Sequence, residues 1–376
     1  MKFSRKILTL VISASLIMGS VQVAFASAAT AASAIPPLTV EEAAMRAIRN
    51  NTSIANAEGD ESVADEVVKR AQDAVFEAVT SATLTNAMIG LMNAELSRSL
   101  NIRDLVAQRQ NVEFQITRYF NTILNMENDL ALLFENLAMA KRELVIAELR
   151  LSLGLMSELD FEAAEFSVVR IETNIGLLES SIERAFRDLN SFMGVYGIDL
   201  DQRYELKLEL SEFTPLPAVN LNHHAQRFVT ESLRVQQAEN AVQTARYRLD
   251  HYVTPHNELT GQIVPGQTRE EVEVDLSRVT RALADTRQVV RENVLNMHSD
   301  LRTSELRIRA DELELERLQR QLEVSETMLE LGRTTPMEID ALRLNITSQE
   351  NALAQAKNSH TILAFAFNNP NIIMGQ

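Results

Sequence analysis

The side chains in this sequence that are best suited to acid–base or metal chemistry are its histidines and its many carboxylates. Two of the histidines, His223 and His224, are adjacent, whereas His251, His256, His298 and His360 are scattered. A metal site needs a further ligand at helical or turn spacing and a second shell that orients it. No such ligand accompanies the adjacent pair, so exposed histidines beside a helix are the favoured interpretation.

The sequence also lacks the short motifs that hold a catalytic nucleophile or a phosphate. It has no cysteine, no glycine-rich phosphate loop and no nucleophile elbow. Its carboxylates alternate with arginine, as in "RIRADELELERLQRQLE" at residues 307–323, where pairing along a solvated helix face accounts for them. We therefore expect no enzymatic activity, no cofactor and no metal. The formal net charge of -16 argues against a nucleic-acid partner.

A glycine, a hydroxyl residue and an acid recur at one spacing in two places. The segments are "LGLMSELDFEAAE" at 153–165 and "LGRTTPMEIDALR" at 331–343, and they align Gly154 with Gly332, Ser157 with Thr335, and Asp160 with Glu338. Glycine adopts the left-handed conformation that ends a helix, a hydroxyl caps the next helix, and an acid suits its first turn. Each segment therefore predicts a tight turn between two helices.

Long helices are predicted on both sides of the first turn. No proline occurs between Pro37 and Pro215, and apolar residues recur at every seventh position. These positions are Ile116, Ile123, Leu130, Leu137, Leu144 and Leu151, and a second apolar set lies three places after them. The pattern resumes from Phe161 to Phe192. It predicts an antiparallel helical hairpin over residues 112–193 with its tip at 154–158.

The same hairpin is encoded a second time, at an offset of 178 residues, the distance from Gly154 to Gly332. The first-arm positions become Val294, Leu301, Ile308, Leu315, Leu322 and Leu329, and the tip becomes 332–336. Polar residues in this second seam, Ser304, Asp311 and Ser325, predict one-sided packing or a wet cavity.

The predicted fold is mainly α, with two tandem long antiparallel coiled-coil hairpins. We assign 38–200 to the first repeat, 201–220 to a short strand and linker, and 221–370 to the second repeat. The strand is expected within "RYELKLEL" at 203–210, where apolar and polar residues alternate. At most one or two short strands are expected in all, with "NIIM" near the C-terminus as a possible partner.

The N-terminal segment has the features of a targeting sequence. Lys2, Arg5 and Lys6 precede an apolar run from Ile7 to about Val23, and small residues follow near residues 24–28. We predict a signal peptide over 1–28 and export of the remaining chain. An uncleaved membrane anchor is the alternative.

The duplicated hairpins, the helix "LTVEEAAMRAIRNN" at 38–51 and "LNSFMG" at 189–194 together resemble the TolC family of outer-membrane efflux proteins. In that family, three protomers pool their helices into a hollow α-barrel. The hairpin tips dock to a periplasmic adaptor, or membrane fusion protein, that serves an inner-membrane transporter. The resemblance implies a homotrimer and assigns two sets of tip residues. The adaptor-docking set is Gly154, Leu155, Ser157, Gly332, Arg333 and Thr335, and the aperture acids are Asp160 and Glu338. Helix capping alone also explains these residue types.

The sequence departs from the family in one respect. Family members insert two membrane-spanning strands per repeat, but the corresponding windows, 80–104 and 251–271, lack the required alternation and aromatic girdles. The first window predicts helix and the second a loop. The chain thus resembles a TolC-type body without the membrane β-barrel strands, placed in the outer membrane or periplasm by resemblance, or elsewhere in the cell envelope if the strands are absent. The alternative function is a non-transporting extracytoplasmic scaffold or adaptor.

Overall fold

The computed structural model describes residues 36–210, 212–254, 266–369 and 372. These residues belong to one compact unit, Pro36–Gln376. The predicted signal peptide and most of the predicted loop at 251–271 lie outside the described residues.

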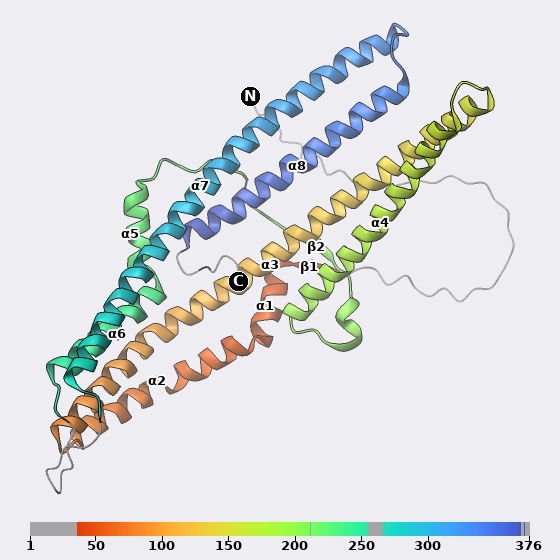
Figure 1. Ribbon diagram of the computed structural model, residues 1–376. Coiled ribbons are helices and arrows are strands. Elements are labelled where there is room, and N and C mark those ends of the chain that lie inside the picture. The colour runs from red at the N-terminus through yellow and green to blue at the C-terminus, as the bar shows by residue number, and fades with distance from the viewer. Residues whose placement is uncertain (1–35, 211, 255–265, 370–371, 373–376) are drawn as a thin grey trace, which may run out of the picture. The chain divides into compact units, whose positions relative to one another are not determined.

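Two tandem helical repeats make up this unit (Figure 1). The elements of the first are β1 (Pro37–Thr39), α1 (Val40–Asn50), α2 (Thr52–Phe76), α3 (Ser81–Ser152), α4 (Glu158–Phe192), the 3-10 helix η1 (Gly197–Asp201) and β2 (Glu205–Lys207). Those of the second are α5 (Leu221–Glu231), α6 (Leu233–Asp250), α7 (Arg269–Glu330) and α8 (Pro336–Asn368). The predicted fold class, with two long hairpins and very little strand, is confirmed.

The first arm of the first hairpin is longer than predicted. Helix α3 has 72 residues and begins at Ser81, whereas the heptad pattern placed the start of the arm at residue 112. The helix starts where it does because Thr80 and Thr83 form a reciprocal capping box. The window from Ser81 to residue 104 is therefore continuous helix, as its sequence predicted.

The predicted strand within residues 203–210 is present, but it is shorter than predicted and pairs with a strand that was not predicted. Strand β2 covers Glu205–Lys207, and its partner is β1, in parallel register with Leu38 opposite Leu206. Residues 38 and 39 were predicted as helix. They are extended because Thr39 serves as the N-cap and accepts a hydrogen bond from the Glu42 N–H at 3.2 Å. A three-residue strand beside two prolines has no periodic pattern that would reveal it.

The helices pack as hairpins and as a junction between hairpins. Helix α3 packs against α4, and α7 against α8, while α2 and α6 cover the first halves of α3 and α7. The hairpins meet where α3 lies beside α8, between α4 and α7 (Figure 1). Helices α4 and α7 share no comparable interface with each other in the described part of the chain.

Burial of the seam residues that recur every seven positions along the first arms, α3 and α7, decreases toward the tips. Ile116, Ile123 and Leu301 are completely buried, whereas the later seam residues Leu137 and Leu315 are only half-buried. We call the end where these first-arm positions are fully covered the hairpin base; farther out they are partly exposed, although Ala147, Ile339 and Leu342 stay buried close to the tips. The polar seam residues Ser304, Asp311 and Ser325 are half-buried, and the one-sided packing or wet cavity expected around them stays a prediction.

Each base contains an apolar core. The first core joins α1, α2, α3, α4, β1 and β2, and includes Leu38, Ile116, Phe120, Ile182 and Phe186. The second joins α5, α7 and α8, and includes Phe228, Val294, Leu301 and Phe367, together with Leu216 from the segment between β2 and α5. A fully buried side chain of this size contributes about 1.5 to 3 kcal/mol, so these cores anchor the otherwise thin hairpins.

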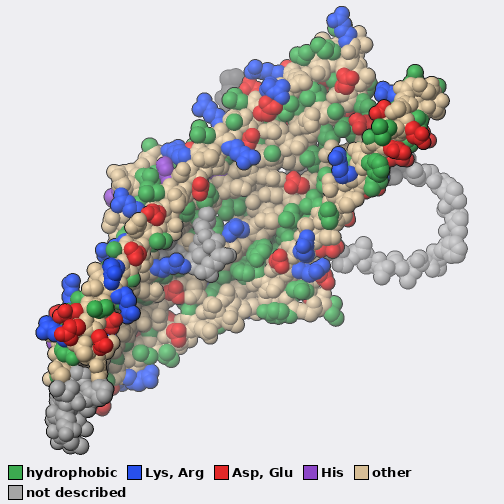
Figure 2. Space-filling model, viewed as in Figure 1, with side chains coloured by type: hydrophobic (Ala, Val, Ile, Leu, Met, Phe, Trp, Pro, Cys, Tyr) green, Lys and Arg blue, Asp and Glu red, His purple; other side chains and the backbone are tan. Residues whose placement is uncertain are grey.

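Surface charge follows the alternation in the sequence. On the face shown in Figure 2, acidic and basic side chains are interspersed with apolar ones along the helices. Among the described residues, no helix is both long enough and apolar enough to cross a membrane.

Candidate docking site at the hairpin tips

Both tips are built on a glycine with left-handed backbone geometry. Gly154 and Gly332 each have φ of 69°, and a Cβ atom at either position would meet nothing within 4 Å. Glycine is therefore required by the backbone conformation and not by crowding. The Leu155 N–H donates to the Arg150 carbonyl at 2.8 Å, and the Arg333 N–H donates to the Met328 carbonyl at the same distance. These bonds complete a Schellman ending for α3 and for α7.

The helices that leave the tips are capped by hydroxyl groups, as predicted. Ser157 Oγ accepts from the Asp160 N–H at 3.2 Å and donates to Asp160 Oδ2 at 2.7 Å. Thr335 Oγ1 accepts from the Glu338 N–H at 3.4 Å, and the Thr334 hydroxyl bonds to the Glu338 carboxylate. Both aperture acids are thus held by local hydroxyl groups in the first turn of a helix.

The tips differ in what they present to solvent. The first tip is apolar, because Leu155 and Leu159 are 74% and 75% exposed. The second tip carries Arg333 at the position equivalent to Leu155, and this arginine is exposed. Exposed leucines at a tight turn contribute nothing to the core of this chain.

The structure places the tips on neighbouring helices. Arg142 Nη1 of α3 donates to Asp340 Oδ2 of α8 at 2.9 Å, about three helical turns before one tip and one turn after the other. Farther along the same junction, Gln355 Nε2 donates to Asp129 Oδ1 at 3.0 Å. The residues predicted for docking therefore belong to adjacent hairpins. Whether Asp160 and Glu338 narrow an aperture remains a prediction, because that role requires other copies of the chain.

A second group of polar residues was not recognised in the sequence. His360 of α8 is 1% exposed and lies against Glu305 of α7, with Nε2 and Oε1 3.5 Å apart. From the sequence alone, His360 was interpreted as one of several scattered histidines. The repeat offset was a usable signal, because it aligns His360 with Ile182, a residue of the first seam.

The adjacent histidines are not equivalent. His223 is exposed, whereas His224 is half-buried, stacks on Phe367 with ring centroids 4.3 Å apart, and shares a hydrogen bond with the Phe367 carbonyl at 2.9 Å. Within residues 36–210, 212–254 and 266–369, no group of three or more histidines and carboxylates is arranged to hold a metal ion.

Comparison with known proteins gives a consistent result for the fold. No family model matches the sequence, and no curated protein matches it. Solved structures do match. The chain is 14% identical to the outer membrane protein VceC from Vibrio cholerae, covering 88% of this chain and 96% of that one, with a TM-score of 0.57. It is 12% identical to CusC, whose structures concern transmembrane channel formation, covering 90% and 93%, with a TM-score of 0.61.

A third match is the CmeC outer membrane channel of Campylobacter jejuni, with 12% identity, coverage of 89% and 84%, and a TM-score of 0.55. Nearly the whole of each chain takes part in these matches. The resemblance to TolC-type channels is therefore confirmed at the level of the fold, and the proteins matched are described as membrane proteins or channels and not as enzymes.

Proposed function

We propose that this chain, which has the fold of TolC-type channels, is one subunit of an extracytoplasmic efflux duct. The observation that carries the proposal is the pair of long tandem hairpins, in which the first-arm seam leucines and isoleucines are fully buried at the base and only half-buried toward the tips. Half-buried leucines such as Leu137 and Leu144 gain further burial only if additional helices cover them. Sister subunits supply such helices, and the resemblance puts their number at three.

The internal duplication indicates where a sister subunit docks. Within the chain, the first arm of repeat one (α3) packs on the return arm of repeat two (α8). If the two repeats exchange roles, the equivalent contact joins the first arm of repeat two (α7) to the return arm of repeat one (α4). These helices lack that junction within one chain, so we place α7 of one subunit against α4 of the next. A head-to-tail contact of this kind generates a ring when the rotation between subunits closes, as a trimer requires.

Charges at the swapped positions support this placement. Shifting by 178 residues carries the Arg142–Asp340 pair onto Arg320 and Glu162, which are exposed and opposite in charge. The same shift carries the stacked rings of Phe114 and Phe365 onto Glu292 and Arg187, again exposed and opposite in charge.

The third junction contact, Asp129–Gln355, maps onto Arg307 and Leu177, which have no such complementarity. Two of the three mapped contacts therefore predict an ion pair between subunits. Each pair also faces a competing partner within the chain. Arg320 contacts Glu316, and Arg187 lies 2.8 Å from Asp201. The pairs are accordingly expected to select the register of docking more than to supply its free energy.

Charge reversal tests the subunit contact. We expect Arg320→Glu and Glu162→Arg each to shift the oligomer toward monomer in sedimentation velocity runs, by about tenfold or less in dissociation constant for a partly exposed pair. The double variant should restore assembly. Arg317→Glu, on the same helix but at a position without a mapped partner, is the matched control. A mature protein that stays monomeric at all concentrations would contradict the duct itself.

The tips are proposed as the end that contacts an adaptor and, through it, a transporter. The exposed leucines of the first tip and Arg333 of the second offer one apolar and one cationic contact, which suits a partner surface carrying an apolar patch next to an acid. Asp160 and Glu338 would line the opening. The substrate class is unassigned, although a carboxylate-lined opening favours cations.

Tethering the tips separates a duct from a scaffold. Because the chain has no cysteine, Asp160→Cys with Glu338→Cys introduces a thiol pair with no background. Oxidation should slow efflux of the fluorescent cation ethidium from cells that depend on this chain, and reduction should restore it. Ser180→Cys with Lys357→Cys, away from the tips, is the control. Efflux that is unaffected by a verified tip disulfide would favour the scaffold.

A further inference from the structure

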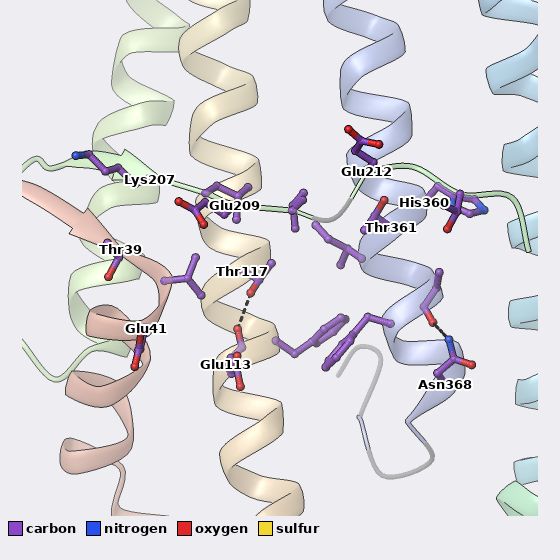
Figure 3. A pocket seen from close by; sticks show the side chains of 18 residues that line it. Thr39, Glu41, Glu113, Thr117, Lys207, Glu209, Glu212, His360, Thr361 and Asn368 are labelled. Atoms are coloured by element: carbon purple, nitrogen blue, oxygen red, sulfur yellow. Dashed lines mark hydrogen bonds between the residues drawn. The ribbon is translucent and has the colours of Figure 1, made fainter. Parts of the chain in front are cut away.

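The segment between the repeats is anchored to the base of the second hairpin. Residues 212–217, which we call the docking segment, precede α5 and insert Leu216, 8% exposed, into the second apolar core. Figure 3 shows the linker running from Lys207 past Glu209 and Glu212 toward the side of α8 that carries His360.

One carboxylate on α7 holds this segment. The Leu216 N–H donates to Glu305 Oε1 at 2.5 Å, and Arg302 Nη1 donates to Glu305 Oε2 at 2.8 Å. The Glu305 side chain is 12% exposed. A backbone N–H bonded to a charged, largely buried carboxylate makes a stronger bond than one between neutral groups, so Glu305 is the main polar anchor of the segment.

An ionisable ring is enclosed beside this anchor. His360 is 1% exposed, and neither of its ring nitrogens makes a hydrogen bond with another residue that the structure describes. Its Nε2 lies 3.5 Å from Glu305 Oε1, and Phe213 of the docking segment covers it edge-on, with ring centroids 4.8 Å apart at 73°. The docking segment therefore covers both the imidazole and the carboxylate.

We propose that His360 and Glu305 form a pH-sensitive latch, which keeps the docking segment on the second hairpin at neutral pH and releases it on acidification. A protonated imidazole carries a charge that the covered site cannot hydrate. Release of the segment exposes the ring to water and removes that cost. Protonation and release are therefore linked, in the same direction at every pH.

The direction of the pH dependence follows from the pKa shifts of both groups. Burial lowers the pKa of His360, and the nearby Glu305 opposes this only in part. Burial raises the pKa of Glu305, but the Leu216 N–H, Arg302 and the nearby His360 together lower it by more. The docked state thus binds protons less readily than the released state at both groups. The contribution of neutral His360 to docking is therefore complete above the ordinary histidine pKa of about 6.5, and it is lost as the pH falls below that value toward the lowered pKa of the docked ring.

Other charges near His360 do not reverse the direction of this pH dependence. Lys357, on the same helix, lies over the Phe213 ring at 5.9 Å, but it is paired with Glu312 of α7 at 2.6 Å. The remaining charged groups face the adjoining cavity from the linker and from α1, α3 and β2, and most are acidic; they are Glu212, Glu209, Glu41, Glu113 and Lys207. All five are exposed, so solvent screens their effect on the ring.

Release of the segment would also change a cavity. Glu212, Thr214 and His360 form part of the lining of a cavity of about 770 Å³, and Phe114 and Phe365 lie across it. Undocking removes one wall of this cavity and exposes Leu216. The latch therefore couples pH to the surface between the two repeats, and it requires only a single chain, whether or not the chain forms a duct.

An introduced tryptophan can report the release. The chain contains no tryptophan, so Phe213→Trp provides a single indole whose accessibility to acrylamide can be measured from pH 8 to pH 5. We expect low accessibility at pH 8, and a docked-to-released ratio that falls by about tenfold for each pH unit below the histidine pKa. Accessibility is preferred to intensity, because protonated histidine quenches indole directly.

Replacing the ring should abolish the response. In the same background, His360→Ile, which copies Ile182 of the first repeat, and His360→Gln should keep the indole covered down to pH 5. His223→Gln removes an exposed histidine and should leave the response unchanged. Glu305→Gln should expose the indole already at pH 8. Far-UV circular dichroism checks that each variant retains its helices.

Two results would overturn the latch. One is an indole that is equally inaccessible at pH 8 and pH 5 in the chain with His360 intact. The other is an acid response that persists in both His360 variants with the same midpoint. If Phe213→Trp itself prevents docking, Leu216→Cys serves instead, with its labelling rate divided by that of Val219→Cys at each pH so that thiol ionisation cancels.

Discussion

The bases of the two hairpins occupy equivalent places in the repeats but are built from different residues. In the first base, Ile182 lies at 2% exposure within an apolar core that six elements share. In the second base, the equivalent residue is His360, and a carboxylate and a backbone N–H from a distant segment replace part of the apolar contact. The heptad seam keeps the same register in both. Register and side-chain chemistry at the base are therefore separable, and the second base depends on protonation where the first does not.

Truncation at these two positions should give the largest difference. Ile182→Ala leaves a cavity in a closed apolar core and is expected to lower the free energy of unfolding by about 2 to 5 kcal/mol. His360→Ala removes packing, but it also removes two ring nitrogens that make no hydrogen bond among the described residues, so its cost at pH 8 should be nearer about 1 kcal/mol. Urea unfolding followed by circular dichroism measures both. Equal costs would mean that the two bases are energetically alike despite their composition.

The parts of this fold that the sequence revealed are those encoded by repetition. Seam residues every seven positions and a glycine, hydroxyl and acid at fixed spacing are local signals, and the structure contains both hairpins and both tips where these signals placed them. The latch has no such signal, because Leu216 and Glu305 are 89 residues apart and neither type is unusual at its position. The available indication was His360, an ionisable residue that occupies a seam position when the two repeats are aligned.

The glycine that ends the first repeat can be compared with the glycine at a tip. Gly194 and Gly332 both have positive φ, at 77° and 69°, but a Cβ atom on Gly194 would lie 2.3 Å from Asn50 Cβ, whereas one on Gly332 would meet nothing. Asn50 is fixed there, because its Nδ2 donates to the Met193 carbonyl at 2.8 Å. Gly332→Ala should cost about 1 to 2 kcal/mol for the backbone alone.

Gly194→Ala should cost about 1 to 3 kcal/mol more than Gly332→Ala, because α1 must shift away from the added methyl group. Thermal unfolding of the two variants side by side measures the difference. Restoring most of the extra loss with Asn50→Gly, which removes the Cβ atom, in the Gly194→Ala background would assign it to this contact. If both alanine variants melt alike, crowding at the base is unimportant, and both glycines serve only the backbone.

The smallest expected effects lie at the tips, where the two caps differ slightly. Ser157 binds both the N–H and the carboxylate of Asp160, whereas in the second tip Thr335 and Thr334 share these contacts and Pro336 begins the helix. Ser157→Ala is expected to cost about 1 kcal/mol, and Thr335→Ala about 0.5 kcal/mol, because Thr334 and Pro336 remain. Hydrogen exchange of peptides spanning each tip resolves changes of this size.

A cap and a docking contact predict different results for one further substitution. Asparagine caps a helix about as well as serine, so Ser157→Asn should leave hydrogen exchange at the tip unchanged. If Ser157 only caps α4, ethidium efflux should also be unchanged. If its hydroxyl contacts an adaptor, efflux should fall although the tip is as stable as before. Because Gly154 and Gly332 already fix the turn, a loss of efflux without a loss of protection would assign Ser157 to the partner surface.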